Sequence, residues 1–152
     1  MSSISDITDA IKSQFLEDSV LSDYTIYDFE DEMVILNDKK TFPFINIKCD
    51  NLKIEDADNM NKRNYERSLF NIIITFAVSE NLKTTAWKNT WELYDAIRDA
   101  IETDRTFGGT VRNAPFRPDV ATDVSSFDDG LLIWVGRGAM VFSVYNDNYV
   151  GG

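Results

Sequence analysis

Apolar residues recur at helical spacing in two segments of the chain. In SISDITDAIKSQFLED, three isoleucines and a phenylalanine follow one another at steps of three and four residues, which predicts an amphipathic helix over residues 3–17. In TTAWKNTWELYDAIRDAIETD, the same spacing predicts a second helix over about residues 85–104. Trp87 and Trp91 belong to its apolar stripe, so we expect both side chains in the core.

Other segments alternate between apolar and polar residues, as strands with one buried face do. The strongest is SLFNIIITFAV, which predicts a strand over residues 69–78 inside a sheet. TFPFINIKC also alternates, and Pro43 predicts that this strand begins there or lies at an edge. YTIYDF and MVIL are shorter strand candidates. The helix residues expected to pack against strand 69–78 are Ile4, Ile7, Ile11, Trp91, Tyr94 and Ile97.

The C-terminal part of the chain holds two apolar runs, LLIWV and AMVFSVY, separated by GRG. Because glycine adopts the positive φ values of a tight turn, this pattern predicts a β-hairpin. The preceding stretch from Phe107 to Gly130 is polar and is interpreted as a long exposed loop. The order of elements predicts an α+β fold in a single domain of residues 1–152: an antiparallel β-sheet with two amphipathic helices packed on one face and a C-terminal β-hairpin.

The residue types available for chemistry are few. The chain has no histidine, which removes Ser-His and Cys-His nucleophile pairs and histidine metal ligands. Cys49 is the single cysteine and cannot form an internal disulfide. The acidic clusters DFEDE, IEDAD and FDDG contain potential ligands of a hard cation, but each is typical of a solvated turn. We therefore expect no enzyme activity, no bound metal and no cofactor.

The net charge of −11 narrows the classes of partner. Binding to DNA or RNA needs a surface rich in lysine and arginine, so direct nucleic-acid binding is not expected. A negative wall instead repels the nucleic-acid backbone, which suits a passage through which DNA must move without sticking. The apolar runs are too short for a membrane helix, and the first residues lack the pattern of a signal peptide.

The order of several segments is similar to the order found in a known protein family. TDRTFGGTVR places a Gly-Gly pair and a Val-Arg pair after an acidic helix end, and a polar loop and apolar strands ending in FSVY follow. Upstream, FPFINIKCDNLK is followed by a polar loop and RSLFNIIITFAV. Together with the leading helix, this order resembles the tail terminator proteins of tailed bacteriophages, which are also called tail completion or tail-to-head joining proteins. The resemblance covers nearly the whole chain.

This resemblance implies a structural virion protein of the phage tail and neck, assembled in the host cytoplasm. Such proteins form a ring, usually a hexamer, that caps the head-proximal end of the tail tube and joins it to the head connector. The implied partners are further copies of the chain, the tail tube protein, the connector or neck protein and, in a contractile tail, the sheath protein. No sequence-specific nucleic acid and no membrane is implied. The expected assembly-interface residues are Lys62, Arg63, Arg67, Arg105, Phe107, Gly108, Gly109, Arg112, Phe116 and Arg117.

The charge also fits an alternative function. An acidic binding or immunity-type module would cover a basic surface of its partner, and it would do so as a monomer. A ring subunit must instead associate with itself through an interface that closes. A further alternative is an enzyme that uses two converging carboxylates, which a pocket holding such a pair would favour.

Overall fold

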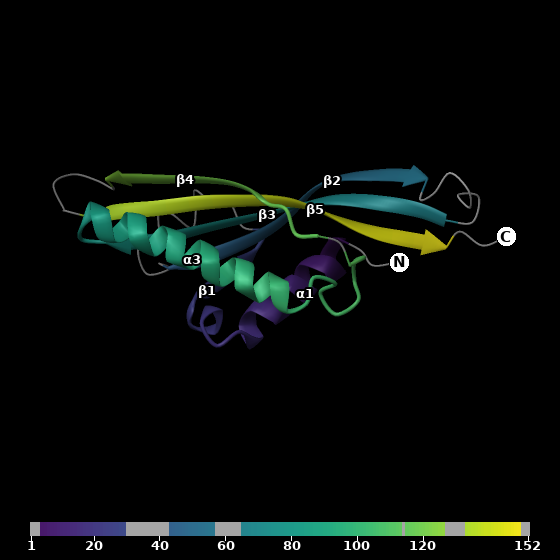
Figure 1. Ribbon diagram of the computed structural model, residues 1–152, viewed down its shortest axis with the longest axis horizontal. Coiled ribbons are helices and arrows are strands. Elements are labelled where there is room, and N and C mark those ends of the chain that lie inside the picture. Colours follow the sequence, from purple (N-terminus) through teal and green to yellow (C-terminus); the bar gives the residue numbers. More distant parts are fainter. Residues whose placement is uncertain (1–3, 30–42, 57–64, 114, 127–132, 150–152) are drawn as a thin grey trace.

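A single sheet, two α-helices and a short 3-10 helix form the described part of the molecule (Figure 1). The computed structural model describes residues 4–29, 43–56, 65–113, 115–126 and 133–149, with side chains described except in 50–56, 65–68 and 146–149. In chain order the elements are α1 (Ile4–Glu17), the short 3-10 helix η1 (Leu21–Asp23), β1 (Thr25–Asp28), β2 (Phe44–Asp56), β3 (Tyr65–Glu80), α3 (Lys83–Thr103), β4 (Asp119–Ser126) and β5 (Trp134–Tyr149). None of the described helices is both long and apolar enough to cross a membrane.

The sheet has the strand order β1-β2-β3-β5-β4. β3 contains the predicted strand 69–78 and lies between β2 and β5, both antiparallel to it. The predicted α+β fold and its central strand are therefore confirmed. The sheet is not wholly antiparallel, because β1 pairs with β2 in parallel. MVIL, the other short strand candidate, lies outside the described residues.

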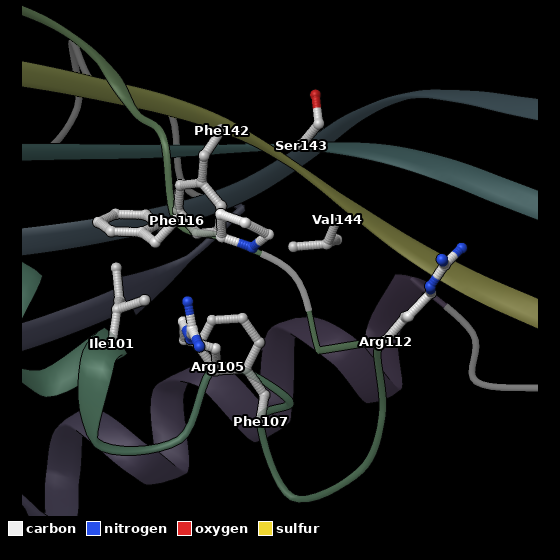
Figure 2. A pocket seen from close by; sticks show the side chains of 9 residues that line it. Ile101, Arg105, Phe107, Arg112, Phe116, Phe142, Ser143 and Val144 are labelled. Carbon is white, nitrogen blue, oxygen red and sulfur yellow. The ribbon is translucent and has the colours of Figure 1, made fainter.

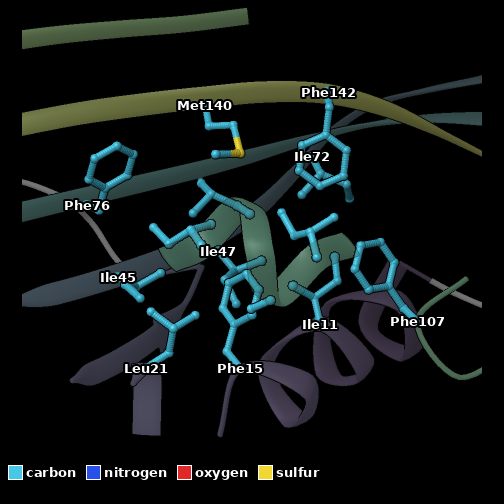
Figure 3. Close-up of a cluster of buried hydrophobic side chains, with 14 of the residues drawn as sticks. Ile11, Phe15, Leu21, Ile45, Ile47, Ile72, Phe76, Phe107, Met140 and Phe142 are labelled. Carbon is cyan, nitrogen blue, oxygen red and sulfur yellow. The ribbon is translucent and has the colours of Figure 1, made fainter. Parts of the chain in front are cut away.

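The core fills the space between the helices and one face of the sheet (Figure 3). Alternate residues of β3 from Phe70 to Val78 are buried on this face, as period-two alternation requires. Ile7, Ile11 and Ile97 are fully buried against them, as the sequence predicts. The partly buried residues that pack against this core include Ile4 and Tyr94.

The two tryptophans of α3 are not core residues, so that prediction is wrong. Trp87 is 49% exposed and Trp91 is 40% exposed. The buried face of α3 is rotated about the helix axis relative to the face that holds the tryptophans. It consists of Ala86, Thr90, Leu93, Ile97, Ala100 and Ile101. The reason is that α3 rests directly on β5: a Cβ built at Gly136 would overlap Thr90 Oγ1 and lie 2.8 Å from the carbonyl oxygen of Ala86. Where the helix meets Gly136, only small side chains fit between helix and strand.

The C-terminal strand pair is present, but its strands differ from the expected ones. Gly136 and Gly138 lie within β5, not in a turn, because β5 runs from Trp134 to Tyr149. Gly136 leaves room for α3, and Gly138 leaves room for the ring of Phe76. The partner strand is β4, which lies in the stretch interpreted as a long loop and pairs antiparallel with β5.

Candidate functional site

The loop that follows α3 has an unusual backbone. Phe107, Gly108 and Gly109 have consecutive positive φ values of 47°, 69° and 84°. Glycine adopts these angles freely, whereas a bulky residue does so rarely. We call residues 104–112 the Gly-Gly loop. Strained backbone of this kind persists where the surrounding structure holds it and is common at functional sites.

Phe107 holds the Gly-Gly loop from inside the protein. Its side chain is 1% exposed and belongs to the core, with its ring centroid 6.4 Å from that of Phe142 on β5. The aromatic side chain is therefore an anchor, and the two glycines beside it are the exposed part of the turn. Burial of the ring offsets the cost of its backbone angle.

Asp104 holds the same loop from its surface. Its carboxylate accepts hydrogen bonds from the hydroxyl of Thr106 at 2.6 Å, the backbone N–H of Gly108 at 2.9 Å and the backbone N–H of Thr106 at 3.0 Å. These bonds, led by that of the Thr106 hydroxyl, lower the pKa of Asp104. The Thr106 hydroxyl oxygen in turn accepts a bond from Gly109 N–H at 3.1 Å. The turn is thus shaped by side chains of its own segment.

Four of the residues predicted for the assembly interface border one hollow: Arg105, Phe107, Arg112 and Phe116 (Figure 2). Phe116 packs edge-on against Phe142, with ring centroids 4.9 Å apart. The free space is about 20 Å³, room for about one water molecule, so the hollow is too small for a substrate.

The two arginines at this hollow are oriented differently. The backbone N–H of Arg112 donates to the carbonyl of Tyr145 at 2.7 Å, which ties the loop to β5, and its guanidinium points away from the aromatic rings (Figure 2). Nε of Arg105 lies 4.0 Å from a carboxylate oxygen of Glu102 on the preceding helix. The hollow therefore has an aromatic floor and a basic rim.

The other predicted interface residues are spread more widely. Gly108, Gly109 and Arg117 are exposed in the connection between α3 and β4. Arg67 lies on β3, directly between Glu55 of β2 and Asp147 of β5 in the register of the sheet. This part of the sheet extends beyond the helices in Figure 1. Lys62 and Arg63 lie outside the described residues.

A larger hollow of about 410 Å³ lies near the other end of α3. Tyr24, Glu80, Asn89 and Glu92 border it, and the side-chain amide of Asn89 donates to Glu80 at 2.6 Å. Burial raises the pKa of Tyr24, and the charges of Glu92 and Asp23 raise it further. This acidic hollow has no signal in the sequence, because Glu80 and Glu92 belong to different elements and share no local motif.

Among the residues that the structure describes, no group of three or more Cys, Asp or Glu side chains is placed to hold a metal ion. Cys49 lies on β2, is not part of a disulfide, and packs partly buried against the core. No protein-family model matches the chain, and no curated protein matches it.

Proposed function

We propose that this chain is a tail terminator: a structural subunit that forms a ring on the head-proximal end of a phage tail tube and joins the tube to the head connector. The observation that carries the proposal is the Gly-Gly loop. Buried Phe107 and the hydrogen bonds to Asp104 hold this loop in a strained shape, yet the hollow beside it has room only for water. Such a loop is suited to contact with another macromolecule.

The contrast between the two hollows beside α3 supports a ring, because one is bordered by arginines and the other by carboxylates. Arg105, Arg112 and Arg117 lie in the segment that follows the C-terminal end of α3, whereas Glu80 and Glu92 border the acidic hollow near its N-terminal end. A helix of 21 residues is about 30 Å long. Two unlike surfaces at separate places along such a helix favour a head-to-tail contact between copies, which generates a ring when the rotation between copies closes.

The net charge of −11 supports the proposed position between tail tube and head connector, where DNA must pass. A ring of such subunits has a predominantly acidic bore, which binds duplex DNA weakly and lets it pass. The partners in this proposal are neighbouring copies, the tail tube protein, the head connector or neck protein and, in a contractile tail, the sheath protein. In this proposal the subunit acts by assembly.

The test is assembly on isolated tail tubes. We expect the protein to cap one end of each tube in electron micrographs, and we expect Arg117→Glu to lower the fraction of capped ends at least fivefold. Arg98→Glu is the matched control, because it makes the same substitution at an exposed position of α3 that borders neither hollow. Bare tube ends with the unaltered protein would contradict the proposal, as would tight duplex binding with a steep salt dependence.

A further inference from the structure

β4 is an outer strand of the sheet (Figure 1). It has eight residues in continuous register with β5, and its sequence DVATDVSS contains no proline and no charged residue other than Asp119 and Asp123. Outer strands are often protected by lysine or other charged residues, by proline, by bulges or by being very short. The outer strand on the other side of the sheet, β1, has only four residues. Among the described residues, the backbone hydrogen bonds of β4 all go to β5.

An aromatic surface on α3 lies beside this strand. The side chain of Asn89 donates a hydrogen bond to Glu80. Glu92 borders the same hollow as Tyr24, which lies between η1 and β1, so this flank of α3 faces η1 and β1. Successive helical residues are about 100° apart, which places Trp87, Trp91 and Tyr94 on the opposite flank. Since α3 rests on β5 at Gly136, that flank faces β4, with which the helix is in contact.

We call Trp87, Trp91 and Tyr94 the aromatic shelf. The rings of Trp91 and Tyr94 meet edge-on with centroids 5.5 Å apart, which orients both side chains. Both tryptophans remain about half exposed. Tryptophan and tyrosine are the residue types most enriched among the energetically dominant residues of protein interfaces.

The opposite face of β4 has a different character. Val120 and Val124 are partly buried on the helix side, whereas Asp119 and Asp123 are exposed on the other side. The carboxylate of Asp123 lies 3.3 Å from the guanidinium of Arg137, and its side chain is still 63% exposed. A strand added beside β4 therefore meets aromatic rings on one face and carboxylates on the other.

We propose that the edge of β4 binds an extended protein segment as a sixth strand, and that the segment alternates apolar and basic side chains. Its main chain completes the hydrogen bonds of β4, its apolar side chains lie on the aromatic shelf, and its basic side chains face Asp119 and Asp123. The acidic surface and the net charge of −11 exclude an acidic segment. This inference does not depend on the proposed function.

The test uses a fluorescein-labelled, amidated eight-residue peptide that alternates valine and lysine. We expect saturable binding in fluorescence anisotropy, and protection of β4 amides from hydrogen exchange when the peptide is bound. Trp91→Ala should weaken binding at least fivefold, since it removes part of the shelf. Leu16→Ala is the matched control, because this exposed residue lies on α1, and should leave the affinity unchanged.

N-methylated peptides distinguish strand addition from simple charge attraction. In an extended strand, alternate residues direct their N–H groups to the same side. N-methylation of one alternate set should therefore abolish binding, while methylation of the other set should leave it unchanged. A peptide that alternates valine and glutamate should not bind.

Three results would overturn the inference. The first is that the valine-lysine peptide does not bind, and the second is that both methylated peptides bind equally well. The third is that β4 amides become protected with rising protein concentration and no peptide, since the occupant is then a second copy of the chain. None of these results concerns capping of tail tubes, so they leave the proposed function to its own test.

Discussion

Replacing Gly136 with alanine tests how α3 rests on the sheet. The new methyl group would overlap Thr90 Oγ1 and lie 2.8 Å from the carbonyl oxygen of Ala86. A side-chain hydroxyl can move, but the carbonyl belongs to the helix backbone, so α3 itself must shift. Overpacking of this kind costs about 1 to 3 kcal/mol.

The expected loss is therefore about 2 kcal/mol of unfolding free energy, which lowers the melting temperature by about 4 to 8 °C in a chain of this size. Urea denaturation followed by far-UV circular dichroism measures the change. We expect the midpoint to fall while the slope of the transition stays the same, because the surface exposed on unfolding is unchanged.

Thr90→Ala makes this prediction specific. Alone it removes the buried hydrogen bond from Thr90 Oγ1 to the carbonyl of Ala86, which is 2.6 Å long, and costs about 1 kcal/mol. Combined with Gly136→Ala it removes one of the two overlapping groups, so the double variant should lose less than the sum of the single losses. Losses that add to within about 0.5 kcal/mol would refute the reasoning.

Gly108→Ala is the matched control for this cycle. It makes the same chemical change at a position where a Cβ meets nothing within 4 Å but where φ is +69°. We expect it to cost about 1 kcal/mol through backbone strain, with no coupling to Thr90→Ala. Coupling at Gly108 as strong as at Gly136 would show that the cycle does not report the contact between helix and strand.

Three further predictions concern the two ends of α3. Phe107→Ala should lower the unfolding free energy by about 3 to 5 kcal/mol in urea denaturation, because the ring is buried, whereas a loss below about 1 kcal/mol would contradict its role as an anchor. Asp104 has a lowered pKa in the folded protein, so its stabilisation is present above its ordinary pKa and is lost as the pH falls through the folded value. Asp104→Asn should therefore flatten the acid side of the stability profile, and an unchanged profile would contradict these hydrogen bonds. Tyr24 has a raised pKa, so the stability linked to its neutral form is present below its ordinary pKa and is lost as the pH rises through the folded value. An ultraviolet titration that loses a late-ionising tyrosine in Tyr24→Phe checks this assignment, and an unchanged titration in this variant would refute it.

The loop after α3 shows how far local sequence reaches at the candidate site. Its Gly-Gly pair predicts an end to the helix and a turn, because the freedom of glycine to adopt positive φ is a property of the residue itself. That Phe107 and Phe116 meet Phe142 depends on β5, which is distant in the chain. The acidic hollow at the other end of α3 had no local signal, since its carboxylates come from β3 and α3.

Strand β4 shows what local sequence does not reveal. DVATDVSS alternates weakly, and its polar residues made the whole stretch resemble a loop. Its pairing with β5 supplies the backbone hydrogen bonds that turn a weak local preference into a strand. The GRG sequence was misinterpreted for a related reason: glycine also occurs where another element approaches the backbone closely, and only the position of α3 distinguishes the two cases.

The sequence by itself determined the two helices, the central strand and the α+β class, because the spacing of apolar residues is a local property that survives in any fold. The face of α3 that is buried was decided only in three dimensions. Trp87 and Trp91 satisfy helical spacing as well as Ala86 and Thr90 do. The close approach of the helix to Gly136 admits only the small side chains, so the tryptophans are left at the surface beside β4.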